Sequence, residues 1–361
     1  MPIPHASHPP GPTVADAADP ADDGFVHRCT LTDTEAKQAL DLAHQCAQEY
    51  GRVDDPRFLA EMGVLAHALP QRARFALHAA ARDSDRAATV IAGNQVDSEA
   101  LGPTPAGWQA ADTPASRPYA FLLMLFSALL GETIAWRTQQ DGRMVGDVVP
   151  TEGLEHSLIS ASSHSELSWH TEDAFSPYRA DWVGLMCLRN AELTPTTLAV
   201  PELGAAPEGV VEVLRQRRFH VVPDNAHVDP PGQGADPAEV SDALADVTRA
   251  RRTPPPVALV SGPPEAFVVR VDRDFTSVAP GDEEAARALA WLIANLDANL
   301  RDLPLAPGDI AFVDNRNAVH GRRSFHPRYN GTDRWLKRVN IVRDLRRTRP
   351  GRASATSRTI G

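Results

Sequence analysis

The chain has 361 residues, of which 42% are hydrophobic and 23% are charged, a composition typical of a folded globular protein. Its 36 basic residues are outnumbered by 47 acidic ones, and the formal net charge of -11 argues against a nucleic-acid-binding surface. The longest apolar run, 119–130, is too short to cross a bilayer and favours a buried helix, so neither nucleic acid nor a membrane is expected as a partner.

The N-terminal residues lack the basic and then apolar pattern of a secretory signal. The cysteines, Cys29, Cys46 and Cys187, are odd in number and show no metal-binding spacing. Both observations favour a cytoplasmic protein with reduced thiols.

The first part of the chain reads as a tail followed by helices. Residues 1–24, rich in proline, alanine and aspartate, are expected to be disordered. Thr32 and Glu35 have the spacing of a capping box, which predicts a helix that ends before Gly51. Further helices are expected at 58–69, 72–81 and 117–130. Residues 32–131 should therefore form the helical part of a single domain that spans 25–345.

From residue 132 onward the pattern changes to short, β-branched runs bounded by turn residues. These eight runs are 134–138, 182–189, 196–200, 220–222, 257–260, 267–271, 310–313 and 337–342. Two helices are expected between them, at 208–217 and 283–299. The fold class is therefore predicted to be mainly β with flanking helices, with a jelly-roll core over 132–345.

Two further segments stand apart from this pattern. Residues 223–256 are rich in proline, aspartate and glycine and weakly patterned, and a loop of that length in a compact domain predicts a lid over a binding pocket. Residues 346–361 are rich in arginine, serine and threonine and are expected to form a flexible C-terminal tail.

A candidate metal site combines His170, Glu172 and His320. The first two lie two residues apart, so on a strand their side chains face the same side. His320 follows the strand-like run 310–313, where a second strand would present its imidazole. Two imidazoles and one carboxylate can hold Fe(II) on one face and leave three positions open. A lone His-x-Glu is more often an ordinary surface or core feature, and the motif gains weight only from its companions.

Arg334 is the companion that indicates a cosubstrate. It follows His320 by fourteen residues, and its guanidinium could bind the far carboxylate of a dicarboxylic acid through two hydrogen bonds. Taken alone, Arg334 would more often form a surface salt bridge. With the three candidate ligands it predicts a non-haem iron oxygenase that uses 2-oxoglutarate and O2.

The stretches WHTEDAFSPYRAD (169–181) and DNRNAVHGR (314–322) resemble the clavaminate-synthase-like Fe(II)/2-oxoglutarate oxygenases. Within this family the resemblance is greatest to the L-arginine 3-hydroxylases of viomycin and capreomycin biosynthesis, and it extends over about 28–346. It implies a distorted double-stranded β-helix, His170, Glu172 and His320 as catalytic iron ligands, and Arg334 as the anchor of 2-oxoglutarate. It also implies that one threonine of 194–197 assists Arg334, with Thr197 as the candidate.

Three acids are candidates for binding the substrate. Asp272 and Asp274 follow a predicted strand, and on an extended chain both carboxylates would point the same way and could accept from a guanidinium. An Asp-x-Asp after a strand is also a common turn. The resemblance implies that Asp224, Asp272 and Asp274 hold an arginine guanidinium. It further implies that the amino-acid end of the substrate is contacted by Gln139, Leu158, Ser160, Glu172 and Arg338.

The expected activity is hydroxylation of free L-arginine at C3, giving 3-hydroxy-L-arginine, succinate and CO2, and the resemblance implies a role in non-ribosomal peptide antibiotic biosynthesis. Hydroxylation at C4, dihydroxylation and desaturation remain open, as do citrulline, lysine, asparagine and carrier-bound substrates. Two other classes of protein also remain: a non-catalytic barrel that binds a metal or an amino acid, and a zinc hydrolase.

Overall fold

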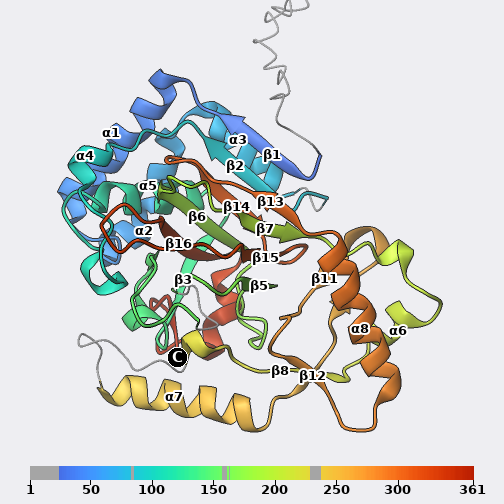
Figure 1. The fold of residues 1–361 in the computed structure, drawn as a ribbon. Coiled ribbons are helices and arrows are strands. Elements are labelled where there is room, and N and C mark those ends of the chain that lie inside the picture. The colour runs from blue at the N-terminus through green and yellow to red at the C-terminus, as the bar shows by residue number, and fades with distance from the viewer. Residues whose placement is uncertain (1–23, 83–84, 157–160, 162, 228–236) are drawn as a thin grey trace, which may run out of the picture.

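The computed structural model describes residues 24–82, 85–156, 161, 163–227 and 237–361. Two sheets dominate the described residues, and helices cover their outer faces (Figure 1). The larger sheet consists, in spatial order, of β1 (Val26–Thr30), β2 (Ala88–Ala92), β14 (Ile310–Asp314), β6 (Trp182–Arg189), β16 (Trp335–Val342), β3 (Glu132–Trp136) and β17 (Thr359–Ile360), with β4 (Gly146–Val148) paired to β16. The smaller sheet consists of β13 (Arg301–Leu303), β7 (Thr196–Ala199), β15 (Val319–Arg322) and β5 (Leu167–His170). This arrangement confirms the predicted jelly-roll core.

Short strands and helices complete the fold. A three-stranded sheet contains β12 (Thr276–Val278), β8 (Phe219–Val221) and β9 (Pro256–Val257), and β10 (Val260–Ser261) pairs with β11 (Val268–Val269). The helices are α1 (Asp33–Tyr50), α2 (Pro56–Leu65), α3 (Gln71–Ala80), α4 (Ser98–Leu101), α5 (Arg117–Ser127), α6 (Val210–Leu214), α7 (Pro237–Arg252) and α8 (Glu283–Ala298).

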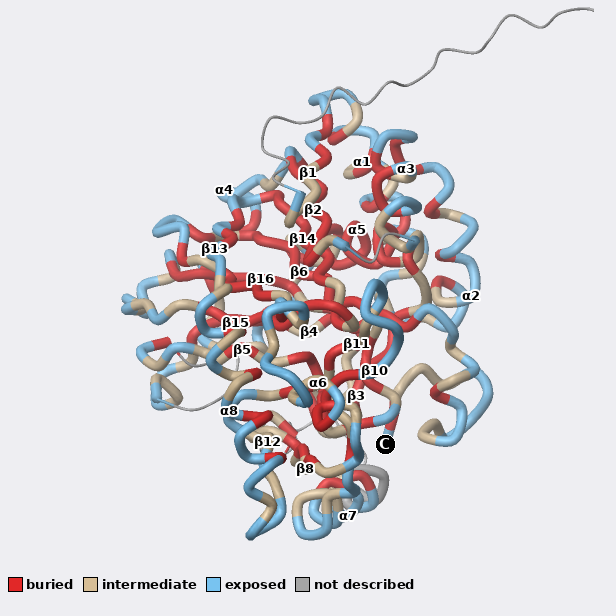
Figure 2. The backbone as a smooth tube through the Cα atoms, turned by 90° about the vertical axis from the view of Figure 1, so that its right-hand side faces the viewer, coloured by how far each residue is buried: buried red, intermediate tan, exposed pale blue. Residues whose placement is uncertain are grey.

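Strand β6 shows how the layers are held together. Because side chains alternate along a strand, Met186 packs with the helices on one face, while Leu185 and Cys187 face β7 and β13 of the smaller sheet. Both faces are buried, which explains why 182–189 is apolar almost throughout rather than alternating. In Figure 2 the central strands β14, β6 and β16 of the large sheet are mostly red, and the peripheral helices are blue on their outer sides.

The local signals in the helical part were interpreted correctly. Helix α1 starts after Thr32, whose side chain accepts from the backbone N–H of Glu35, and the Glu35 carboxylate accepts from the Thr32 N–H in return. It ends at Gly51, which has a positive φ of 72°. Residues 32–131, expected to form the helical part, also contain the strand β2, which was not predicted. That strand pairs in parallel with β1 and antiparallel with β14, and so extends the large sheet.

The stretch 223–256 is more ordered than its composition suggested. It contains the sixteen-residue helix α7, which the weak pattern did not predict. Residues 228–236 within the stretch, like residues 1–23 of the expected N-terminal tail, lie outside the described residues.

The expectation of a loose tail at 346–361 was wrong. Strand β17 pairs in parallel with β3, and Ile360 is only 1% exposed, buried against Ile134, Trp136 and Val342. A two-residue strand gives too short a periodicity to stand out from a polar sequence, and its partner lies more than 200 residues away.

Replacing Ile360 by alanine is therefore expected to lower the free energy of unfolding by about 2 kcal/mol, because it removes buried methyl groups and leaves a cavity. Chemical denaturation monitored by tryptophan fluorescence would measure the change. The exposed Ala353 is the matched position, and Ala353→Ser should leave stability unchanged. Equal stability of both variants would mean that the C-terminus does not pack.

Candidate metal centre and surrounding pocket

Two neighbouring strands bring the three predicted metal ligands together. His170 ends β5, and His320 lies directly opposite it on β15 in an antiparallel register, with the two ring centroids 4.6 Å apart. Glu172 follows in the turn after β5. Gly321, beside His320, permits the close approach of the strands, since a Cβ there would lie 2.5 Å from the Leu167 carbonyl oxygen.

The donor atoms of the three side chains converge. Glu172 Oε2 lies 3.3 Å from His320 Nε2 and 3.6 Å from His170 Nε2, and one ligand atom from each residue lies within 4.8 Å of the others. His170 Nδ1 lies 2.9 Å from the Ser168 carbonyl oxygen, which fixes the ring and leaves Nε2 for the site. Two imidazole nitrogens and one carboxylate oxygen on one face fit Fe(II).

Glu172 is held in its charged form although it is only 3% exposed. Burial opposes ionisation, but Arg338, His170 and His320 outweigh it and hold the pKa of Glu172 well below its usual range. Arg338 Nη1 donates to Glu172 Oε1 at 2.8 Å, so one carboxylate oxygen meets the arginine and the other meets the histidines. Arg338, which the resemblance assigned to the amino-acid end of the substrate, thus also contacts a metal ligand.

Asn315 is a site residue that the sequence did not reveal. Its side-chain oxygen accepts from the Glu172 N–H at 2.7 Å, and its amide donates to the Glu172 carbonyl at 3.2 Å and to the Ala180 carbonyl at 2.9 Å. It is fully buried in the turn that connects β14 and β15. Asn315 therefore fixes the backbone of one metal ligand from the connection that leads to another.

Asn315→Ala is expected to weaken Fe(II) binding roughly 10- to 100-fold, because removing an outer partner lets the ligand backbone move. Anaerobic titration with Fe(II) would measure this. The control is Asn317→Ala in the same turn, whose side chain bonds to the Arg86 carbonyl rather than to Glu172. Equal Fe(II) affinity in the two variants would contradict the assigned role.

Arg334 lines the same pocket as the three ligands. Burial lowers the pKa of its guanidinium to about 10, its Nε has no partner, and Nη2 donates to Thr196 Oγ1 at 3.3 Å. A buried cation without a counter-charge is costly and favours an anionic ligand. The threonine that contacts Arg334 is Thr196, whereas the candidate from the resemblance was Thr197. Along β7 the two side chains face opposite ways, and only Thr196 lines the pocket.

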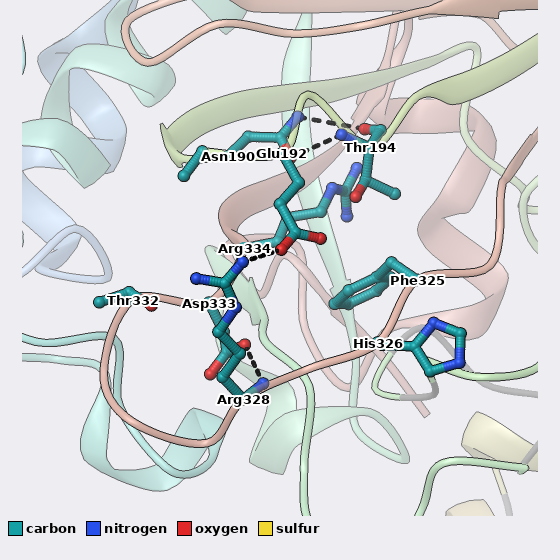
Figure 3. Close-up of a pocket in the computed structure, with 10 residues that line it drawn as sticks. Asn190, Glu192, Thr194, Phe325, His326, Arg328, Thr332, Asp333 and Arg334 are labelled. Atoms are coloured by element: carbon teal, nitrogen blue, oxygen red, sulfur yellow. Dashed lines mark hydrogen bonds and ion pairs between the residues drawn. The ribbon is translucent and has the colours of Figure 1, made fainter.

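Arg334 also separates the metal pocket from a second, more superficial one. Figure 3 shows this second pocket, in which Glu192 pairs with Arg328 at 2.6 Å, and Phe325 and His326 stand on the opposite wall. Its exposed acid Glu192 and exposed base Arg328 thus already form an ion pair. The metal pocket, in contrast, has apolar walls that include Leu185 and Leu336.

The three predicted substrate acids are not equivalent. Asp224 lines the metal pocket, and Asp272 lies beside His170 in an isolated bridge. Burial, together with Asp224, raises the pKa of Asp272 to about 6, although His170 opposes the shift. Asp272 also accepts from the backbone N–H groups of Asp274 and Phe275. The Asp-x-Asp segment therefore also forms the turn that was the alternative interpretation. Asp274 itself is exposed and lies 4.0 Å from Arg273.

Of the remaining candidates, Gln139 contacts Arg338, the partner of the metal ligand Glu172. Its Oε1 accepts from Arg338 Nη2 at 3.0 Å, and its Nε2 lies 3.1 Å from His227 Nε2. Leu158 and Ser160 lie outside the described residues.

Comparison with known proteins agrees with this geometry. Residues 123–340 match the family model described as taurine catabolism dioxygenase TauD, TfdA family. The chain belongs to the TauD/TfdA family. The match spans β3 through most of β16 and includes all three candidate ligands and Arg334. Combined with the converging His–Glu–His cluster, it identifies the chain as a non-haem iron, 2-oxoglutarate-dependent dioxygenase.

Several known proteins are similar to this chain over nearly their whole length. An enduracididine beta-hydroxylase from Streptomyces hygroscopicus is 38% identical, over 91% of this chain and 98% of the relative. An L-ornithine/L-arginine 3-hydroxylase from Catenulispora acidiphila is 35% identical, over 93% and 100%. The non-heme iron oxygenase OrfP, solved with Fe, succinate and (3S)-hydroxy-L-Arg, superposes with a TM-score of 0.87 at 37% identity, over 92% and 99%.

These findings decide between the classes left open by the sequence. Membership of a dioxygenase family, with the ligand set intact, argues against a zinc hydrolase and against a non-catalytic barrel. Within the described part of the chain, no helix is both long and apolar enough to cross a membrane.

Proposed function

We propose that this dioxygenase hydroxylates free L-arginine at C3, giving 3-hydroxy-L-arginine, succinate and CO2. The observation that carries the proposal is the pair Asp224 and Asp272 beside the metal ligands, where no lysine or arginine of the described residues pairs with either carboxylate. One acid in the wall of a partly apolar pocket and a second beside the ligand His170 favour a cationic substrate with several donors. The names of the relatives, which include arginine 3-hydroxylation, support the same substrate class.

The pocket residues divide the work between cosubstrate and substrate. Arg334 and Thr196 would bind the far carboxylate of 2-oxoglutarate. Asp224 and Asp272 would orient the guanidinium, and Arg338 with Gln139 would meet the amino-acid end. Iron, when bound, supplies the O2 activation that decarboxylates 2-oxoglutarate and oxidises the substrate. The apolar walls and the segment 223–256, as a lid, would exclude water.

We further propose, on the sequence resemblance described above, that the product enters the biosynthesis of a peptide antibiotic. The product could also carry a second hydroxyl group, since OrfP has been solved with (3R,4R)-dihydroxy-L-Arg. Relatives named as lysine and asparagine oxygenases make those amino acids the proper comparison substrates.

Replacing Asp224 by asparagine keeps the size of the side chain and removes its charge. We expect the KM for L-arginine to rise roughly 10- to 100-fold, the equivalent of one hydrogen bond between charged groups. The KM for 2-oxoglutarate should stay within about twofold, because Arg334 is unchanged. Asp246→Asn on α7, an exposed acid paired with Arg249, is the matched control. An unchanged KM for L-arginine in Asp224→Asn would rule out the assigned guanidinium contact.

A further inference from the structure

His227 is a buried histidine that joins three parts of the fold. It is 1% exposed, at the end of the 3-10 turn Asn225–His227. Its Nε2 lies 2.9 Å from Asp173 Oδ1, and its Nδ1 lies 2.7 Å from Thr138 Oγ1. The rings of Phe175 and Trp136 pack edge-on against it, with centroids 4.8 and 5.4 Å away.

Asp173, the partner of His227, directly follows the metal ligand Glu172. Its φ of 53° places it in the left-handed region, which few residues other than glycine, asparagine and aspartate adopt. Its other carboxylate oxygen accepts from Trp136 Nε1 on β3 and from Asn340 Nδ2 on β16. Asp173 is therefore held by the large sheet and offers His227 a fixed attachment point.

The turn that ends in His227 is held from the other side by α7. Arg251 donates to the Pro223 carbonyl at 3.0 Å and to Asn225 Oδ1 at 2.8 Å. Asp224 lies between these two attachments. Its Oδ1 accepts from the Ala226 N–H at 3.1 Å, so the conformation of the turn determines where its carboxylate points.

We propose that His227 is a positioning residue, which fixes Asp224 in the pocket by binding to Asp173 beside the metal centre. The inference rests on the proposed function, because it gives Asp224 a substrate to orient. Without this contact the turn that carries Asp224 would keep its attachment to Arg251 but lose the one beside the metal centre, and the guanidinium would bind loosely. A substrate displaced by about 1 Å loses hydroxylation far more than it loses cosubstrate turnover. Succinate would then form without matching product.

Two substitutions separate hydrogen bonding from packing. His227→Phe keeps an aromatic ring against Trp136 and Phe175 but has no nitrogen for Asp173, whereas His227→Gln keeps a polar nitrogen. His220→Phe is the matched control, since His220 lies on nearby β8 and its ring nitrogen bonds to the Pro254 carbonyl. If His227→Phe does not fold, the shorter amide of His227→Asn replaces it.

In His227→Phe, we expect the KM for L-arginine to rise about tenfold or more, and succinate to exceed hydroxylated product. The KM for 2-oxoglutarate should stay within about twofold, and His227→Gln should recover most of the coupling. A merely structural role would lower stability without this split. A parallel rise of both KM values, or no change in KM and coupling, would overturn the proposal.

Hydrogen exchange of residues 219–227 tests the contact independently of the substrate. Exchange should be faster in His227→Phe than in the wild type or in His220→Phe, because the turn loses one of its two attachments. If the wild type does not turn over L-arginine, the proposed function fails while exchange still decides whether His227 holds the turn. Equal exchange in the three proteins would overturn the positioning role.

Discussion

Replacing His320 by alanine is expected to abolish stoichiometric Fe(II) binding and to reduce succinate formation by at least about 1,000-fold. The residue supplies one of the two imidazoles whose nitrogens converge on Glu172 Oε2. Its loss leaves only His170 and Glu172 as ligands, too few to hold Fe(II) firmly. It also removes the geometry that keeps the cosubstrate and O2 on one face of the metal. Anaerobic Fe(II) titration and a succinate assay would measure both effects.

The control for this prediction is His326→Ala. His326 lies six residues further along, is exposed, and lines the superficial pocket of Figure 3 rather than the metal pocket. It should bind one Fe(II) and turn over normally. Retention of iron and activity in His320→Ala would contradict the assigned ligand set. Recovery of metal-stripped wild-type protein with zinc instead of iron would contradict the assigned metal.

Replacing Arg334 by leucine is expected to raise the KM for 2-oxoglutarate about 100-fold or more, while the KM for L-arginine changes little. The guanidinium is buried, its Nε is unpartnered, and the described residues place no carboxylate against it. Two charge-assisted hydrogen bonds to the cosubstrate account for an effect of this size. Arg334→Lys should recover only part of it, because an ammonium cannot bind both carboxylate oxygens in a plane.

The thermal stability of the same variant gives a second measurement. Without 2-oxoglutarate, Arg334→Leu should be as stable as the wild type or more so, since an unpaired buried charge has been removed. Added 2-oxoglutarate should raise the melting temperature of the wild type and not of the variant. Arg328→Leu, which loses only an exposed pair with Glu192, is the control. A cosubstrate-dependent shift that survives in Arg334→Leu would mean that 2-oxoglutarate is anchored elsewhere.

The sequence predicted those elements whose signal lies within the element itself. The capping box at Thr32 and the continuous apolar run 182–189 both gave helix and strand limits within a residue of those observed. Strands β5 and β15 were not among the eight predicted runs, although the metal-site prediction placed His170 and His320 on strands. Each has four residues and includes polar or small ones, because the ligands and Gly321 occupy positions that apolar residues would otherwise fill.

The supporting residues of the site were beyond the reach of the sequence for another reason. Asn315 contacts Glu172 from 143 positions away, and His227 contacts Asp173 from 54 positions away. An asparagine in a turn and a histidine in a polar loop have many ordinary explanations, and only their contacts give them a role. The ligands and Arg334 were recognisable because their chemistry and spacing restrict the alternatives. The sequence could not decide between Thr196 and Thr197, because the choice depends on which face of β7 each side chain occupies. Only the structure shows this.

C3 hydroxylation of free L-arginine is tested most directly by identifying the product of the iron-loaded wild-type enzyme. The reaction contains 2-oxoglutarate, O2 and a panel of free amino acids. Mass spectrometry would detect added oxygen, NMR would locate it, and succinate would be counted against product. We expect L-arginine to gain one oxygen at C3 with one succinate formed per product. Citrulline, lysine and asparagine should react poorly. Efficient, coupled hydroxylation of one of those three, with L-arginine left unchanged, would contradict this expectation.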